Sequence, residues 1–332
     1  MKKERIMHEN LKRLYFAILL LSFGCTSYHN KTSVEEVNSH VDPLTLKAGE
    51  LEAVFIDNSA YGETHSAGYN GIAELIHEEQ DSTLFVPFYS GFNIEHIFGG
   101  DSLIELFEPR RYPMHLERID ESSVMLHQPE TPLSHMESWT TFTAIPPHYI
   151  DVDFRCIFHS NEFFQHGYAG IFWASYINEP ADKKIYFYGC DKKSDYSWLE
   201  GWSPKHGLKS THLSEQDNHH LFMVPNFNIT LANDFSDYRF EKPYYYGRFH
   251  NMVFAYLFDV PENGLIRFSQ SPTGGGEKNP AWDFHFIIPN VKRKTQYTFS
   301  ARLVYKEFIG REDITDEYEQ WSKIQNQQNQ NH

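Results

Sequence analysis

The chain has 332 residues, of which 40% are hydrophobic and 16% aromatic, so it can bury a large core. Its formal net charge of -16, with no Lys/Arg-rich stripe in the part expected to fold, argues against nucleic-acid binding, which needs clustered cations against phosphate. The sequence carries no Walker, Rossmann or serine-hydrolase motif, which disfavours kinase, dehydrogenase and serine-hydrolase activities.

The N-terminus has the features of a targeting segment. Basic residues up to Arg13 precede an apolar run, residues 14–23, which has the length of a signal h-region and is too short for a membrane span. Residues 22–25 (SFGC) resemble a bacterial lipoprotein box, although Ser22 stands where that motif usually has an aliphatic residue. The resemblance implies lipidation of Cys25 and a place in the bacterial cell envelope, outside the cytoplasm; an ordinary secretory peptide is the alternative.

The rest of the chain predicts one folded domain between polar ends. Residues 1–24 are the expected signal peptide, and residues 25–47 are polar without periodicity, as in a flexible tether. Residues 48–324 alternate short apolar runs with Gly, Asn and Pro, which is typical of an all-β fold. We expect a large antiparallel β-sandwich that ends in a short helix at 313–324, followed by a disordered tail at 325–332.

Strand-like runs are spread evenly along this domain. They lie at 51–58, 71–76, 83–89, 114–119, 123–127, 137–144, 149–158, 184–189, 252–258, 264–269, 282–288 and 296–305. Residues 91–100 have the pattern of a compact glycine-bounded segment, and residues 190–220 that of a long polar excursion. Cys156 and Cys190 are expected to be buried free thiols, with a disulfide between them as the alternative.

The run 149–158 is the centre of the functional interpretation. Period two puts one set of side chains on one face of this strand: Ile150, Val152, Phe154, Cys156 and Phe158. The other face carries Tyr149, Asp151, Asp153 and Arg155. Charged and phenolic groups in a row suit a ligand-facing sheet; a solvated surface with cross-strand ion pairs is the alternative.

We expect a cleft over this sheet, because aromatic rings stack on sugar C–H surfaces while Asp, Asn and Arg bond hydroxyl pairs. The predicted ligand-binding residues are Tyr149, Asp151, Arg155, Trp173, Tyr176, Asn279 and Trp282. The predicted catalytic residues are His166 as proton acceptor, Arg248 as partner of a uronate carboxylate, and Tyr246. Trp173 and Tyr176 lie on opposite faces of a regular strand, so at least one of them is expected in the core.

Cofactor and metal motifs are missing from the sequence. The histidines show no HExxH or comparable ligand spacing, and the triple glycine at 274–276 lacks the GKS ending of a phosphate loop. We therefore expect no cofactor and no metal site.

Several segments resemble a family of uncharacterised secreted bacterial proteins of planctomycete type, over residues 50–315. The segments are AGYNGIAEL, GFNIEHIF, ESWTTFTAIPPHYIDVDFRC, GYAGIFWASYIN, PYYYGR and NPAWDFHFI. The run of strands and the Trp-Asp-Phe at 282–284 also look like the galactose-mutarotase-like supersandwich, which aldose epimerases, polysaccharide lyases and glycoside hydrolase domains share. That second resemblance implies a concave, carbohydrate-facing sheet.

These observations leave several functions open. The first is an envelope-anchored carbohydrate-active lipoprotein, a polysaccharide lyase or sugar epimerase that works by proton abstraction. The others are a non-catalytic glycan-binding protein and a structural envelope protein. A glycosidase is a further alternative; its carboxylates would be Glu137, Asp151, Asp153 and Asp283. The expected partners are a poly- or oligosaccharide and, through the lipid anchor only, a membrane, with no nucleic acid.

Overall fold

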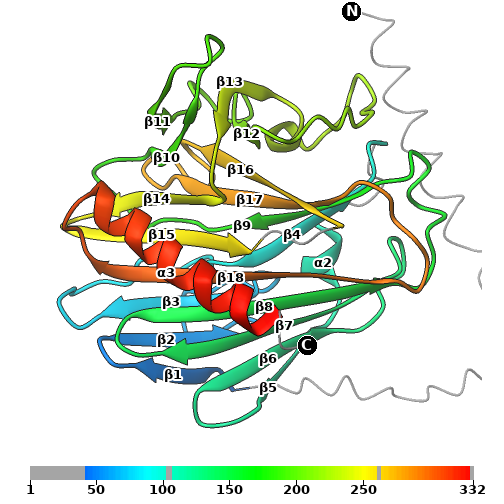
Figure 1. The fold of residues 1–332 in the computed structure, drawn as a ribbon. Coiled ribbons are helices and arrows are strands. Elements are labelled where there is room, and N and C mark those ends of the chain that lie inside the picture. Colours follow the sequence, from blue (N-terminus) through cyan, green and yellow to red (C-terminus); the bar gives the residue numbers. More distant parts are fainter. Residues whose placement is uncertain (1–41, 102–106, 260–262, 330–332) are drawn as a thin grey trace, which may run out of the picture. The chain divides into compact units, whose positions relative to one another are not determined.

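The computed structural model describes residues 42–101, 107–259 and 263–329 (Figure 1). Strands account for 46% of the residues and helices for 9%, which confirms the predicted all-β fold with one C-terminal helix. The predicted signal peptide, Cys25 and most of the predicted tether lie outside the described residues. Among the described helices, none is long and apolar enough to cross a membrane.

The strands form two sheets. The smaller is three-stranded and antiparallel, in the order β1 (Leu44–Ala48), β2 (Leu51–Ile56) and β3 (Gly71–His77). The larger is fifteen-stranded, in the order β4 (Asn93–Phe98), β9 (Ala169–Ala174), β17 (Ala281–Ile288), β16 (Leu265–Ser271), β12 (Thr211–Ser214), β13 (Phe235–Phe240), β10 (Ile185–Cys190), β14 (Tyr244–Phe249), β15 (Met252–Asp259), β18 (Gln296–Glu307), β8 (Tyr149–Phe158), β7 (Met136–Ile145), β6 (Ser123–Gln128) and β5 (His115–Arg118). In this sheet β11 (Tyr196–Gly201) pairs with β10, and only the β12–β13 pair is parallel among the described strands. The described helices are α2 (Glu108–Arg111), a 3-10 turn (Thr230–Ala232) and α3 (Arg311–Asn329).

The pattern of the central strands explains why they form a half-buried sheet. Every second side chain of β7 and β8 is buried, and on β8 these are the predicted ones, from Ile150 to Phe158. The intervening side chains, including Asp153 and Arg155, are exposed or half-buried. The predicted alternation is therefore confirmed, and the polar face of β8 lies on the outside of the sheet.

The main core forms because the large sheet folds back on itself. Aromatic rings from β9 and β17 meet rings from β8 and β18: the ring centroids are 5.0 Å apart for Phe154 and Trp173, and 5.7 Å apart for Phe284 and Phe299. Aromatic pairs of this kind stabilise a core by about 0.5–1.5 kcal/mol beyond the area they bury. Cys156 and Cys190 are free and buried, so the disulfide alternative is not realised.

Several elements differ from the sequence prediction. Residues 93–98 are the fully buried strand β4, and the polar excursion 190–220 contributes β11 and β12 to the sheet. Short strands that are buried on both faces, or solvated at an edge, lack a period-two signal. Conversely, the predicted strand 83–89 makes only a single β-bridge, from Phe85 to Ile177.

The two ends of the domain also lie further out than predicted. β1 begins at Leu44, inside the predicted tether, because Leu46 and Ala48 are buried. α3 begins at Arg311 and runs to Asn329, through much of the predicted tail, since Gln-rich sequence is compatible with helix.

α3 covers part of the outer face of the large sheet. Its buried residues Ile314 and Trp321 pack on the side chains of β14, β15 and β18, among them Tyr244 and Val304. Figure 1 shows α3 lying across these strands. The hydroxyls of Tyr244 and Thr315 are 2.9 Å apart, which ties the helix to β14.

Glu317 is the polar anchor of α3. Its carboxylate accepts hydrogen bonds from the Tyr149 hydroxyl at 2.8 Å and the Lys306 ammonium at 2.5 Å, with His148 Nε2 at 3.8 Å. Burial alone would raise the pKa of Glu317, but the surrounding His148, Lys306 and Tyr149 outweigh it and lower this pKa to about 2.

We expect Glu317→Gln to remove a stabilising contribution that depends on pH. The folded-state pKa is below the unfolded value, so the contribution is fully present above about pH 4.5 and is lost as pH falls toward 2. Urea unfolding should therefore show the variant clearly less stable than the wild type at pH 7, and the two nearly equal near pH 2. The exposed neighbour Asp316 supplies the control, Asp316→Asn, which should show a small difference at both pH values. A gap between wild type and Glu317→Gln that stays constant with pH would contradict this assignment.

Candidate functional site

A groove of about 270 Å³ lies on the outer face of the large sheet, over β7, β8 and β18. Its walls combine an indole, a guanidinium, a carboxylate and several hydroxyls. The lining residues are Trp139, Thr141, Asp153, Phe154, Arg155, Thr298, Phe299 and Ser300. The groove thus lies on the polar face that the alternation of β8 predicts.

Strand register builds a row of side chains along one side of the groove. His127, Trp139, Arg155 and Thr298 are register partners on β6, β7, β8 and β18. The His127 ring stacks on the Trp139 ring with centroids 5.0 Å and planes 5° apart, and the guanidinium carbon of Arg155 lies 4.1 Å from the Trp139 ring centroid. The indole is thus flanked by a ring on one side and a cation on the other, so it supports Arg155 and offers no free stacking face.

Unlike its neighbour Arg302, Arg155 forms no ion pair with a carboxylate of the described residues. The Arg302 guanidinium donates to both oxygens of Asp151, at 2.6 and 2.8 Å. Arg155 is exposed, and its only recorded interaction with a described residue is the contact with Trp139. Asp153, two residues before Arg155 on β8, accepts a hydrogen bond from the Ser300 hydroxyl at 2.6 Å. The groove therefore presents free guanidinium donors beside hydroxyls and one carboxylate.

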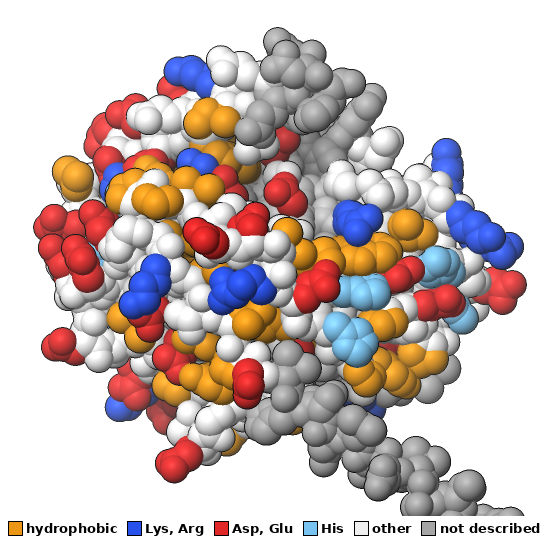
Figure 2. Space-filling model, turned by 90° about the horizontal axis from the view of Figure 1, so that it is seen from below, with side chains coloured by type: hydrophobic (Ala, Val, Ile, Leu, Met, Phe, Trp, Pro, Cys, Tyr) orange, Lys and Arg blue, Asp and Glu red, His pale blue; other side chains and the backbone are white. Residues whose placement is uncertain are grey.

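Glu137 lies on β7, two residues before Trp139, and bridges two histidines. Its oxygens are 2.9 Å from His127 Nε2 and 2.8 Å from His159 Nε2. Burial would raise the pKa of Glu137, but the hydrogen bonds from His159 and His127 outweigh it, so the pKa is lowered. The Glu137 carboxylate is thereby kept ionised, and both of its oxygens are already engaged by histidines. Figure 2 shows histidine side chains gathered beside acidic and hydrophobic ones on the face seen from below.

A second polar centre, the Glu95 cluster, comprises Glu95, His96, Arg110 and Tyr176. The Tyr176 hydroxyl donates to one oxygen of Glu95, and His96 Nε2 lies 3.1 Å from the other. A guanidinium nitrogen of Arg110 lies 4.0 Å from Glu95, and its guanidinium carbon is 3.6 Å from the centre of the Tyr69 ring. These side chains come from β4, α2 and the segment after β9, so the fold gathers them from distant parts of the chain.

The environment of the Glu95 cluster shifts its proton equilibria. Burial would raise the pKa of Glu95, but His96, Tyr176 and Arg110 outweigh it and lower this pKa. Burial and the Glu95 charge raise the pKa of Tyr176 well above its usual value. Nearby Asp283 is also buried, and burial raises its pKa well above the usual range. One carboxyl is thus held ionised and the other is pushed toward its neutral form, a pairing typical of acid–base sites.

No described group of three His, Cys, Asp or Glu side chains is arranged to hold a metal ion.

The structure divides the predicted ligand-binding residues among several environments. Arg155 alone lines the groove. Tyr149 and Asp151 share its sheet face as predicted, but Tyr149 donates to Glu317 of α3 and Asp151 pairs with Arg302. Asn279 lies in a turn, where its side-chain nitrogen donates to the carbonyl of Gly275 at 3.1 Å.

The predicted aromatic platforms are buried. Trp173 and Trp282 are 1% and 0% exposed and belong to the main core, because they occupy the inner face of the sheet. Tyr176 is also buried, but it belongs to a different cluster and bonds to Glu95. The prediction that at least one of Trp173 and Tyr176 is a core residue is confirmed.

Of the predicted catalytic residues, Tyr246 and Arg248 lie on one face of β14, as predicted, and both contact the Phe308 ring, whereas His166 contacts other residues. His166 lies in the segment after β8, 2.9 Å from Asp101 and against the Phe222 ring. Tyr246 is buried under α3, stacked on Tyr186. Arg248 lies 3.7 Å from the centre of the Phe308 ring and donates to the carbonyl of Met252. None of the three lines the groove over β7, β8 and β18.

Sequence reasoning named Arg155 and Tyr176 but missed their partners in the two centres. Trp139 lies in a strictly alternating strand, but its place beside Arg155 depends on the pairing register of β7 and β8. Glu95 and His96 lie on β4, whose six residues are all buried and therefore show no alternation. Arg110 had no local signal of function.

Comparison with known proteins gives a fold likeness and no family. No family model and no curated protein matches the chain, so the resemblance to a secreted planctomycete-type family has no support. Among solved structures, a provisionally assigned aldose 1-epimerase from Escherichia coli K12 is similar with a TM-score of 0.45 and 8% identity, over 80% of this chain and 99% of that one.

Two further solved structures are similar. An aldose epimerase homologue from C. elegans has a TM-score of 0.44 and 8% identity, over 80% of this chain and 99% of that one. A heparan sulfate lyase mutant from Pedobacter heparinus has a TM-score of 0.43 and 13% identity, over 81% of this chain and 36% of the lyase. With every TM-score below 0.5, these likenesses carry no conclusion about substrate or reaction.

Proposed function

We propose that this protein binds an acidic carbohydrate in the groove over β7, β8 and β18. The observation that carries the proposal is the Arg155 guanidinium, held against Trp139 without a carboxylate partner among the described residues. An exposed arginine fixed on a ring loses less side-chain freedom on binding than a mobile one.

The chemistry of the groove fits a sugar that carries a carboxylate or sulfate. A guanidinium fork matches the geometry of either anion and can bond it through two parallel N–H groups. Asp153, Thr141 and Ser300 line the adjacent part of the groove and can accept or donate hydrogen bonds to sugar hydroxyls. The volume of about 270 Å³ is just below the range of roughly 300–1,000 Å³ typical of small-molecule sites, which suits one sugar unit of a longer chain.

We expect Arg155→Ala to weaken binding of a uronic-acid oligosaccharide by roughly ten- to a hundredfold, as loss of a charge-assisted hydrogen bond of about 1.5–3 kcal/mol implies. Arg155→Lys should recover part of the loss, because it keeps the charge but not the fork. Isothermal titration calorimetry with an acidic oligosaccharide and its neutral counterpart measures both effects.

The matched control for this experiment is Arg118→Ala. Arg118 is also exposed, on β5, and donates to the Thr45 carbonyl away from the groove. Its replacement should leave affinity within about twofold, as expected for a surface substitution that contacts no ligand. Equal affinity of Arg155→Ala and wild type for the acidic oligosaccharide would rule out this binding mode.

A second candidate function is a carbohydrate-active lyase or epimerase that works by proton abstraction at the Glu95 cluster. The specific observation in its favour is one ionised, buried carboxylate that contacts a phenol and an imidazole and lies near a guanidinium. Glu95 would accept the proton from the sugar, and Arg110 would stabilise the anion that develops. A substrate would first have to displace one of the donors that now occupy Glu95.

This second function predicts that Glu95→Gln abolishes turnover of an acidic polysaccharide, with rates at least a hundredfold below wild type, as is usual for loss of a general base. Ultraviolet absorbance of unsaturated products detects a lyase, and NMR of the sugar detects an epimerase. Circular dichroism of the variant controls for folding. Wild-type turnover in a folded Glu95→Gln protein would eliminate the Glu95 cluster as a catalytic centre, and Arg155→Ala should in contrast change substrate affinity more than turnover.

We further propose that the mature protein begins at Cys25 and is lipid-anchored in the bacterial envelope. The support is the lipoprotein-like motif after a signal-length apolar run. Intact-mass analysis of the membrane fraction should show a lipid-modified protein without residues 1–24, and Cys25→Ala should shift it to the unmodified form. An unchanged mass pattern in Cys25→Ala would refute lipidation at this cysteine.

A further inference from the structure

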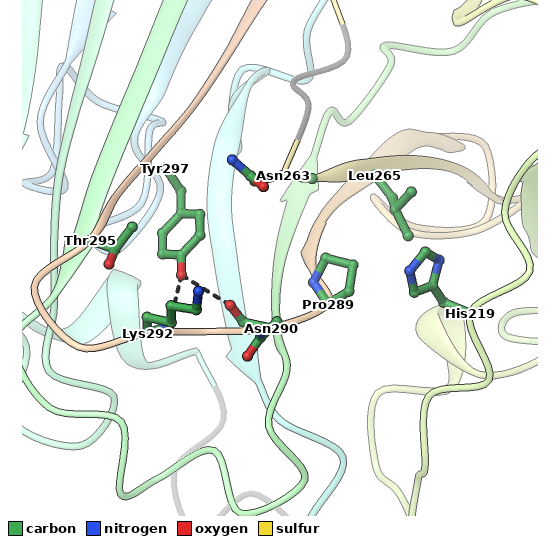
Figure 3. Close-up of a pocket in the computed structure, with 9 residues that line it drawn as sticks. His219, Asn263, Leu265, Pro289, Asn290, Lys292, Thr295 and Tyr297 are labelled. Atoms are coloured by element: carbon green, nitrogen blue, oxygen red, sulfur yellow. Dashed lines mark hydrogen bonds between the residues drawn. The ribbon is translucent and has the colours of Figure 1, made fainter.

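A second hollow, of about 290 Å³, lies between the start of β16, the end of β17 and the start of β18 (Figure 3). It is lined by His219, Asn263, Gly264, Leu265, Pro289, Asn290, Lys292, Thr295 and Tyr297. Among the described residues, the lining contains a lysine, a histidine and two amides but no carboxylate. The carboxylate of Asp217, which does not line the hollow, lies 3.5 Å from His219 Nδ1. The chain has 45 acidic and 29 basic residues and is negatively charged overall, whereas the charged side chain that lines the hollow is a cation.

The wall that carries Lys292 is held by a buried tyrosine. Tyr297 Oη accepts a hydrogen bond from the Lys292 backbone N–H at 2.7 Å and donates to the Asn290 carbonyl at 3.1 Å. The adjacent Val291 N–H donates to the Gly167 carbonyl at 2.9 Å. These bonds fix the turn between β17 and β18, and Figure 3 shows Lys292, Asn290 and Tyr297 together on this side of the hollow.

The opposite wall carries His219 and is held by a buried ion pair. Arg267 Nε lies 2.7 Å from Asp217, and the side chains of both residues are essentially inaccessible. Asp217 accepts the backbone N–H of His219 at 3.1 Å, and Arg267 donates to the His219 carbonyl at 3.4 Å. A buried pair is costly to form, and here it fixes the backbone that presents an exposed imidazole to the hollow.

Lys292 differs from the paired lysines of the fold. Lys184, Lys242 and Lys306 form ion pairs with nearby carboxylates at 2.5–3.0 Å. The Lys292 ammonium has no such partner among the described residues, although its backbone is fixed. A cation left unpaired on a rigid turn, across a hollow from a histidine and next to amide donors, is pre-organised for an anion.

We propose that this hollow is an oxyanion site, which takes a sulfate, phosphate or carboxylate group between Lys292 and His219. The oxyanion is either a free inorganic ion or a substituent on a sugar, since both present the same acceptor oxygens. The site shares no lining residue with the groove at Arg155, so it is independent of the proposed function.

Calorimetric titration of the full chain tests the site, with sodium sulfate, a sulfated disaccharide and its unsulfated counterpart as probes at constant ionic strength. Lys292→Ala should weaken binding of the anionic probes at least tenfold, and His219→Gln at least threefold. Lys294→Ala is the matched control, because Lys294 belongs to the same turn but does not line the hollow; it should stay within twofold of wild type.

The outcomes separate the sources of the anion and the two proposals. Binding of inorganic sulfate that depends on Lys292 supports a free-ion site, and Lys292-dependent binding of the sulfated disaccharide alone supports a glycan substituent. Equal weakening in Lys292→Ala and Lys294→Ala, or no anion binding by the wild type, would overturn this inference. Equal weakening in the two lysine variants bears on this site alone, because the Arg155 proposal is tested by the Arg155 variants with a uronic-acid oligosaccharide.

Discussion

The structure depends on one constraint: the large sheet folds back on itself, and on the central strands β7 and β8 this buries every second side chain and leaves the others on the outer face. The inner face is filled with aromatic rings, such as Phe154 against Trp173, and this core holds the two halves of the sheet together. Because side chains alternate with period two, burying one set fixes the direction of the other. The polar face of β8 therefore follows directly from the packing of its apolar face.

The outer face is then divided by α3. The helix packs on aromatic residues of β14 and aliphatic residues of β15, and Glu317 accepts a hydrogen bond from Tyr149. Asp153 and Arg155, further along β8, stay exposed. Cross-strand stacking with Trp139 turns this remaining stretch into a rigid surface with a fixed cation. Three features of the fold thus produce the groove: the alternation of side chains along β8, the pairing register of β7 and β8, and the limit of the area that α3 covers.

The sequence allows the first of these to be predicted, but not the other two. The alternation of 149–158 is visible in the residues, and it correctly placed Arg155 on the outer face. The pairing of Trp139 with Arg155 depends on the register between β7 and β8. Tyr149 is engaged by Glu317 instead of a ligand because α3 packs beside it, and the position of α3 is not visible in the local sequence. Glu95 escaped prediction because β4 is buried on both faces, so it has no periodic pattern, and Arg110 joins it from the short helix α2.

The central claim is that the ligand's anionic group lies against Arg155 on the outer face of β8. A crystal structure of the protein soaked with a uronic-acid disaccharide tests it most directly. The account predicts electron density for a carboxylate within hydrogen-bonding distance of the Arg155 guanidinium, with sugar hydroxyls near Asp153 and Ser300. Density for the sugar at the Glu95 cluster or elsewhere, with the groove empty at saturating ligand, would contradict it.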